Sequence, residues 1–278
     1  MLHFDLLICD LSLFEFHPIL SQPEANAVDS AESKFSGIQR YFQALQRLQT
    51  QVIEAQEDIL ERVASRMAHT IARGGRIFVF GSGHSHMMAE EGFFRAGGLA
   101  AVVPIFSSAL MLHEHPEVSG RLERTGGLAA VLLNRYDPQP DEILLVFSNS
   151  GVNQLPVEMA VEAGARGLFV VAVLSLAYAR ISPLSEIGRR LDEVSDAVID
   201  NGGQPGDALV AIPGFEWRVG PTSTIVAALI WNCLVTETVN QLQQAGAAVP
   251  VFASLNMPGA QEHNRVLINQ WRKFNPHL

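Results

Sequence analysis

RIFVFGSGHSH, residues 76–86, joins a short apolar run directly to a turn of small and polar residues. Unbroken Val, Ile and Phe residues are typical of a parallel strand that is buried on both faces. Four further runs of this kind follow along the chain: AVVPI (101–105), EILLVF (142–147), LFVVAVL (168–174) and DAVID (196–200). We therefore predict a parallel sheet of five strands.

Helices are expected between and around these runs. The connecting segments are about 20–35 residues long, which suits helices that cross over between parallel strands. Before the first strand, apolar residues recur at helical spacing from Gly37 to Gly74-Gly75, as one long helix or a pair. The other helices are predicted near residues 84–96, 121–135, 153–165, 184–194, 221–244 and 260–273.

These elements predict the α/β fold class in a single domain over residues 37–278. The domain is expected to be a three-layer αβα structure, with a doubly wound parallel sheet and extra N- and C-terminal helices. Residues 1–36 show no clear period, so a tail or capping segment of unknown role is expected there.

Composition argues against several classes of protein. The net charge is −10 and the 19 Lys and Arg residues are scattered, so nucleic-acid binding is not expected. There is no run of about 18 apolar residues and no basic N-terminal start, so we expect neither a membrane-spanning helix nor a signal peptide. Cys9 and Cys233 lie far apart and lack zinc spacing. The sequence favours a cytoplasmic protein without membrane contact, metal or other cofactor.

Three turns carry the candidate binding residues. In an open parallel sheet, ligands bind beyond the carboxyl ends of the strands. Two of them follow the first and third strands, and the third begins a late helix. All three bring hydroxyl and amide groups to helix N-termini. Free N–H groups and the helix dipole attract an anion there. The candidates are Ser82, Ser85, Ser148, Asn149, Ser150, Asn153, Thr222 and Ser223.

Simpler roles for these turns stay open. Ser85 and Asn153 could act only as helix caps, and Pro221 suits the first turn of a capped helix. Two such turns on one sheet still favour a binding site. GSGHS lacks the third glycine of a dinucleotide-binding turn, and no acidic residue follows the second strand. These departures argue against a nicotinamide-dependent dehydrogenase.

Several motifs together resemble the SIS (sugar isomerase) domain family, over roughly residues 37–273. In particular they resemble an uncharacterised branch of single-domain SIS proteins. The motifs are GHSHMMAEEGFFRAGGL (83–99), LMLHE (110–114), IDNG (199–202), GPTST (220–224) and EHN (262–264). The resemblance implies a five-stranded parallel sheet in flavodoxin-like order and assembly as a homodimer or homotetramer. It also implies binding of a phosphorylated sugar and, in many members, aldose–ketose isomerisation.

The resemblance also implies roles for individual residues. The phosphate is expected on Ser148, Ser150 and Asn153, with Ser85 nearby. Thr222 and Ser223 match a Thr/Ser cluster that faces the ligand in SIS proteins.

An isomerase of this kind needs an acid and a base near the sugar. At the position of the late helix where many SIS isomerases carry an acidic residue, this chain has Asn232, and Glu237 lies further along. We rank Glu262 with His263 first as replacements, Glu90 with His84 second, and Glu114 with His113 third. Each of these residues could instead be an ordinary surface, core or capping residue. His86 and Glu90 could also ligate a metal, but a third ligand is missing.

The sequence thus favours an aldose–ketose or amino-sugar phosphate isomerase. A non-catalytic phosphosugar sensor is the alternative, favoured by Asn232, and a sugar-phosphate lyase or etherase ranks below both. Trp217 and Arg218, in a loop after the fifth strand, could contact the ligand.

Overall fold

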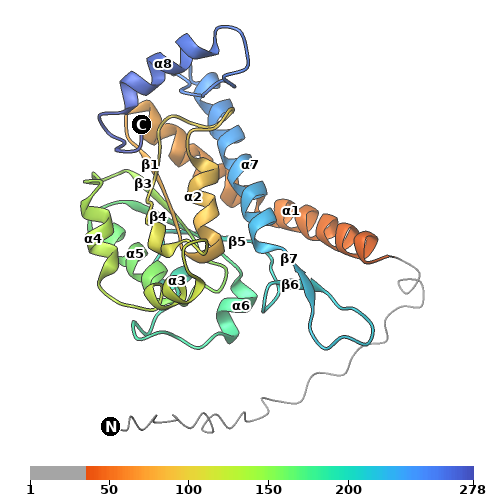
Figure 1. The fold of residues 1–278 in the computed structure, drawn as a ribbon. Helices are drawn as coiled ribbons and strands as arrows, with labels where there is room; N and C mark the ends of the chain where they lie inside the picture. Colours follow the sequence, from red (N-terminus) through yellow and green to blue (C-terminus); the bar gives the residue numbers. More distant parts are fainter. Residues whose placement is uncertain (1–35) are drawn as a thin grey trace, which may run out of the picture. The chain divides into compact units, whose positions relative to one another are not determined.

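A five-stranded parallel sheet forms the centre of the protein (Figure 1). The computed structural model describes residues 36–278, so the predicted N-terminal segment lies outside the described part except for Ser36. Strand order is β2-β1-β3-β4-β5, which confirms the flavodoxin-like order, and all neighbours pair in parallel. The strands are β1 (Ile77–Gly81), β2 (Val102–Pro104), β3 (Ile143–Phe147), β4 (Phe169–Leu174) and β5 (Ala197–Asp200).

Helices cover both faces of the sheet and give the predicted three layers. Successive strand residues point to opposite faces. Ile77 and Val79 therefore join one hydrophobic core, while Phe78 and Phe80 join the other. The first core packs against α1 (Gly37–Ala72), α2 (Met87–Gly92), α7 (Ser223–Gln244) and α8 (Ala260–Trp271). The second packs against α4 (Leu128–Asn134), α5 (Gln154–Ala165) and α6 (Leu176–Ile181).

Three predicted helices differ from the structure. The helix expected over 121–135 is two short helices, α3 (Pro116–Leu122) and α4, because Gly127 between them has a φ of 85°. The helix expected over 84–96 begins as a 3-10 turn, η2 (Gly83–His86), and α2 ends at Gly92. Phe94 soon afterwards has a φ of 42°, which no helix tolerates.

The prediction of a helix over residues 184–194 is wrong. That segment is irregular apart from a 3-10 turn, η4 (Leu191–Glu193). Its backbone is held by tertiary contacts instead, since Leu191 N–H donates to Gly151 O and Ile187 N–H donates to Gln154 Oε1. The segment is thereby fixed against the turn that follows β3.

A small hairpin precedes α7 where only a loop was expected. Strands β6 (Ala208–Val210) and β7 (Val219–Pro221) pair in antiparallel fashion. The hairpin is tied to α1 by the Tyr41 hydroxyl, which donates to Pro221 O over 2.7 Å. Trp217 and Arg218 lie between the two strands and are exposed.

Of the described helices, α7 alone is long and apolar enough by composition to cross a membrane. Its buried face, which includes Val226, Ile230 and Trp231, belongs to the core that it shares with α1. Core packing accounts for its apolar composition.

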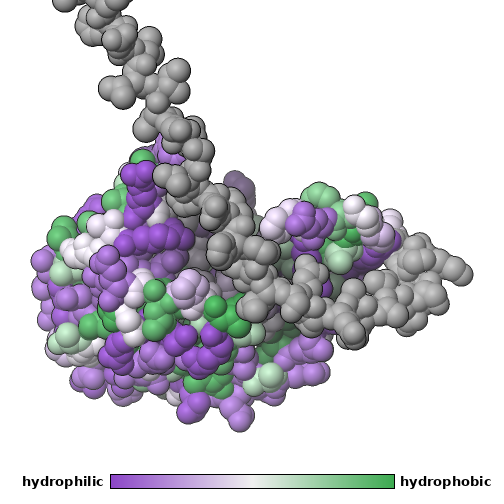
Figure 2. Space-filling model, turned by 90° about the horizontal axis from the view of Figure 1, so that it is seen from below, coloured by the Kyte–Doolittle hydropathy of each residue, from purple (hydrophilic) through white to green (hydrophobic). Residues whose placement is uncertain are grey.

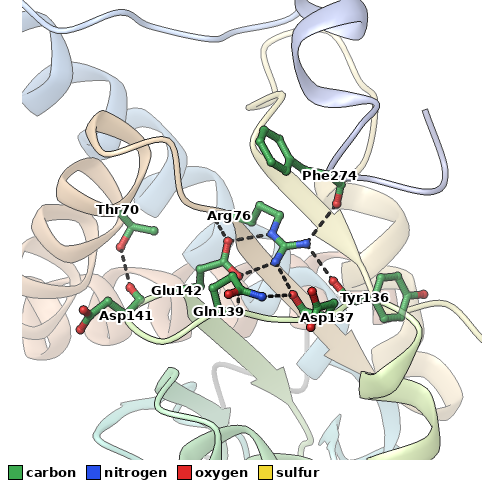
Figure 3. A network of polar contacts seen from close by, with 8 residues as sticks. All are labelled: Thr70, Arg76, Tyr136, Asp137, Gln139, Asp141, Glu142 and Phe274. Atoms are coloured by element: carbon green, nitrogen blue, oxygen red, sulfur yellow. Dashed lines mark hydrogen bonds and ion pairs between the residues drawn. The ribbon is translucent and has the colours of Figure 1, made fainter.

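A buried ion pair closes the amino-terminal end of the sheet (Figure 3). Arg76 and Glu142 are 6% and 5% exposed and meet in two parallel contacts of 2.7 Å. The remaining guanidinium N–H groups donate to the carbonyl oxygens of Tyr136, Asp137 and Phe274. Both ions are thus fully hydrogen-bonded, the condition under which a buried pair is tolerated.

Amide side chains bond to both outer strands. Asn275 Nδ2 donates to Val102 O of β2 over 3.1 Å, and Gln56 Oε1 accepts the N–H of Asp200 in β5 over 3.0 Å. The first amide comes from the segment after α8 and the second from α1.

The C-terminal segment adds a histidine to an aromatic cluster. His277 Nε2 lies 3.0 Å from the Tyr136 hydroxyl and its ring packs against Phe106 and Phe93. Burial, helped by the positive charge of Arg135, lowers the pKa of His277 below the usual 6.5.

We predict that the protein is less stable at pH 5 than at pH 7.5, partly through His277. A depressed folded-state pKa means that the unfolded chain binds a proton first as the pH falls below about 6.5, so stability is lost towards acid. Urea unfolding of the wild type and of His277→Asn at both pH values tests this. The variant should lose less stability on acidification, whereas His115→Asn, a change at an exposed position, should follow the wild type; equal losses in all three would contradict the assignment.

Candidate functional site

A cavity of about 790 Å³ opens beyond the carboxyl ends of the strands. In Figure 2, which views the molecule from this side, hydrophilic and hydrophobic residues are mixed on the surface. The predicted residues that line the cavity are Ser82, His84, Ser85, Ser148, Asn149, Ser150, Asn153 and Ser223. The structure therefore brings together the three turns that the sequence singled out.

The turn between β3 and α5 offers unpaired donors. In the described part of the chain, no hydrogen bond uses the N–H groups of Ser150, Gly151 or Val152. Gly151 has a φ of 63°, and a Cβ there would lie 2.5 Å from Leu174 Cδ1, so a larger residue would be strained and would displace Leu174. Successive free N–H groups around such a residue form a concave site for anions.

The turn between β1 and α2 is equally tight. A Cβ on Gly81 would lie 2.2 Å from Ser85 O, because the chain folds back on itself there. Ser85 is half-buried and Ser82 is buried, and both line the cavity. The Ser82 hydroxyl donates to Glu123 Oε2 over 3.0 Å.

The start of α7 is organised by Asp207, in the loop before β6. Its carboxylate accepts the N–H groups of Thr222 and Ser223 and, over 2.6 Å, the Ser223 hydroxyl. The Thr222 hydroxyl also lies 3.3 Å from Asp207 Oδ1. Ser223 lines the cavity, whereas Thr222 is 1% exposed and does not. The structure therefore gives Thr222 a packing role at the helix start.

Glu123, which the sequence did not single out, lies at the junction of two turns. Its Oε1 accepts from Asn153 Nδ2 over 3.0 Å and from the Arg124 guanidinium over 2.9 Å. Its own carbonyl oxygen accepts the N–H of Leu155, in the first turn of α5, over 2.9 Å. The Asn153 side chain forms no cap hydrogen bond to α5, and its amide donates to Glu123 instead.

Other lining residues were also missed by sequence reasoning. The segment 182–186, expected to be partly helical, forms one wall of the cavity together with Tyr178. It carries two hydroxyl groups and a carboxylate. The missed residues with polar side chains are Ser119, Glu123, Arg124, Tyr178, Ser182, Ser185, Glu186 and Asp207.

The first-ranked catalytic pair lies away from this cavity. Glu262 and His263 are on α8, at the opposite end of the molecule from α3 and α6 (Figure 1). Exposed Glu262 is paired with Arg265, whose hydrogen bonds lower the pKa of the Glu262 carboxyl. His263 Nε2 lies 2.8 Å from Val251 O. Neither residue lines the cavity of its own chain.

The remaining candidates are divided. His84 lines the cavity, but Glu90, His113 and Glu114 do not. Asn232, in the place of an expected acid, donates to Glu91 Oε1, which also pairs with Arg95. Asn232 is therefore part of a polar contact between α7 and α2.

The pair considered for a metal has no third ligand nearby. Within residues 36–278, no group of three or more His, Cys, Asp or Glu side chains is arranged to hold a metal ion. His86 Nδ1 lies 3.4 Å from Glu90 Oε1, and its ring stacks on Phe106. Burial lowers the pKa of His86 and Glu90 opposes the shift, which favours a neutral, packed imidazole.

Comparisons with known sequences agree with this architecture. The SIS domain profile matches residues 40–175. A UPF0309 protein of Shouchella clausii is 37% identical over 84% of this chain and 96% of its own length. A UPF0309 protein of Geobacillus thermodenitrificans is 38% identical over 87% of this chain and 97% of its own length.

Solved structures are less similar. Phosphoheptose isomerase GmhA from Neisseria gonorrhoeae is 17% identical with a TM-score of 0.48, over 74% of this chain and 97% of its own. The Vibrio vulnificus NanR protein complexed with ManNAc-6P is 15% identical with a TM-score of 0.47, over 86% of this chain and 71% of its own.

Proposed function

The chain belongs to the UPF0309 family of SIS-domain proteins, and we propose on that basis that its cavity binds a phosphorylated sugar. The observation that carries the proposal is the set of unpaired N–H groups at Ser150, Gly151 and Val152, at the start of the 12-residue helix α5. Backbone donors at a helix N-terminus are a general means of holding phosphate without net positive charge.

The surrounding groups suit the rest of such a ligand. Hydroxyls of Ser148 and Ser150 lie on the same turn, and Ser85 and Ser223 reach the cavity from two other elements. A volume of about 790 Å³ is within the range for a small-molecule site. Sugar hydroxyls can then meet the polar wall formed by Tyr178 and residues 182–186.

The finer proposal is that the protein interconverts an aldose phosphate and a ketose phosphate. His84 and Glu123 are two of the titratable side chains in the cavity that could move a proton between neighbouring carbons. Glu262 and His263 would have to act in the cavity of another copy of the chain. Sugar phosphates are charged and are held inside cells, so we place the protein in the cytoplasm.

A non-catalytic sensor is the second candidate. It is favoured by Asn232, which replaces the acid of many SIS isomerases and is held by Glu91. A sensor would bind the same ligand in the same turns without exchanging its protons.

Titration calorimetry with hexose, heptose and amino-sugar phosphates, each beside its unphosphorylated sugar, tests the binding proposal. We expect at least one phosphate to bind more tightly than its parent sugar by about a hundredfold, because the donors at α5 meet only the phosphate. Equal binding of both forms, or no binding at all, would refute it. NMR in D2O then separates the candidates: deuterium incorporated at C2 indicates an isomerase, and bound sugar without exchange indicates a sensor.

A further inference from the structure

The proposed phosphate site already contains an anion of the protein itself. The Glu123 carboxylate takes one donor from the turn after β1, the Ser82 hydroxyl, and one from the turn after β3, the Asn153 amide. Both contacts are 3.0 Å long and join the two turns through one side chain. Ser82 and Asn153 are also residues that the sequence assigned to the ligand.

The carboxylate is only partly neutralised. Arg124 donates to Glu123 Oε1, but its side chain is 61% exposed and also donates to Gly120 O. An ion pair that is open to solvent is screened and weak. A phosphate held by the start of α5 would therefore lie close to a carboxylate that keeps much of its negative charge.

The position of Glu123 is set by the backbone. Its carbonyl oxygen accepts the N–H of Leu155, and the Gly127 N–H donates to both carboxylate oxygens of Glu158 on α5. The segment from Glu123 to Gly127 is thus tied to the first turns of α5, the helix that follows the turn with the free N–H groups. The backbone of Glu123 is therefore held beside the start of α5, and the donors of Ser82 and Asn153 hold its carboxylate.

We propose that Glu123 is a specificity-determining residue, which rejects inorganic phosphate and accepts a phosphorylated sugar. This inference rests on the proposed function of the cavity. Inorganic phosphate meets repulsion from the carboxylate and has no sugar hydroxyls to offer in return. A sugar phosphate carries hydroxyls that donate to the same carboxylate, and such charge-assisted hydrogen bonds are stronger than neutral ones.

The variant Glu123→Gln tests the effect of the negative charge while the side chain keeps nearly the same shape. The amide can still accept from Asn153 and can donate to the Ser82 hydroxyl, so the local contacts are kept while the charge is lost. We expect inorganic phosphate to bind this variant about tenfold more tightly than the wild type, as removal of a like charge a few ångströms away implies. A sugar phosphate should bind equally or more weakly, because hydrogen bonds to a charged acceptor are lost.

Glu117→Gln is the matched control. Glu117 is on α3, the helix that ends directly before Glu123, but it is exposed and does not line the cavity. This variant has the same net charge as Glu123→Gln, and its affinities for both probes should stay within about twofold of the wild type. Calorimetric titrations with inorganic phosphate and with the tightest sugar phosphate of the panel give both affinities.

Unchanged or weaker binding of inorganic phosphate by Glu123→Gln overturns the inference, as does a similar gain in Glu117→Gln. If Glu123→Gln does not fold, Glu123→Ala carries the same test, because it also removes the charge and keeps the carbonyl that Leu155 needs. Failure of the wild type to bind any sugar phosphate would defeat the proposed function itself. Tight sugar-phosphate binding, with no gain for inorganic phosphate in the variant, would defeat only the role of Glu123.

Discussion

Ser150→Asp should lower the affinity for a sugar phosphate by about a hundredfold or more. Ser150 lines the cavity together with Ser148, and its own N–H is one of the free donors of the turn. A carboxylate there would occupy those donors and repel a phosphate at a distance of a few ångströms, which is worth a few kcal/mol near a protein surface.

Ser150→Asn is the control for this change, since it has nearly the same size and no charge. It should lose no more than about tenfold in affinity, and both variants should unfold near the wild-type temperature because Ser150 is only half-buried. Calorimetry and thermal unfolding measure the two effects separately. Sugar-phosphate binding by Ser150→Asp that is as tight as that of Ser150→Asn would exclude this turn as the phosphate site.

Glu142→Ala should lower the free energy of unfolding by about 3–5 kcal/mol. The carboxylate accepts both parallel N–H groups of Arg76 and the backbone N–H groups of Arg76 and Gln139 (Figure 3). Without it, the guanidinium of Arg76, a residue that is 6% exposed, keeps three carbonyl partners but no counter-charge. A buried charge without its partner is among the most destabilising single changes.

The neighbouring Asp141 provides the control. Its side chain is 74% exposed and its pair with Arg66 is 3.3 Å long, so Asp141→Asn should cost less than about 1 kcal/mol. Asn also tolerates the φ of 68° at this position. Urea unfolding compares the variants, and Arg76→Met combined with Glu142→Leu should recover part of the loss. A cost for Glu142→Ala no larger than that for Asp141→Asn would mean that the pair contributes nothing.

The sheet was predictable because its strands are buried on both faces. Such strands leave unbroken apolar runs, and the runs at 76–80, 142–147 and 168–174 contain or overlap β1, β3 and β4. Once the strands are placed, the turns beyond their carboxyl ends follow from the geometry of a parallel sheet. That is why Ser85 and Ser150 could be assigned to one cavity from sequence alone.

What sequence reasoning missed depends on tertiary contacts. The irregular segment that contains Ile187 forms backbone hydrogen bonds to the Gln154 side chain, in the first turn of α5, and to Gly151 in the turn before that helix. No local sequence pattern indicates these contacts. Glu123 reaches the cavity because Gly127 breaks the expected helix and lets the segment dock on α5. Thr222 was assigned to the ligand for its hydroxyl at a helix start, and the sequence did not show that the hairpin brings Asp207 beside it.

The amides bonded to the two outer strands bear on how the protein behaves at high concentration. A sheet border with unused main-chain groups is a template on which a strand of another molecule can add, the first step towards fibrils and insoluble aggregates. Asn275 occupies an acceptor on β2 and Gln56 occupies a donor on β5. On each border, a side chain from a distant part of the sequence therefore occupies one of the unused main-chain groups. This lowers the tendency of the folded protein to aggregate.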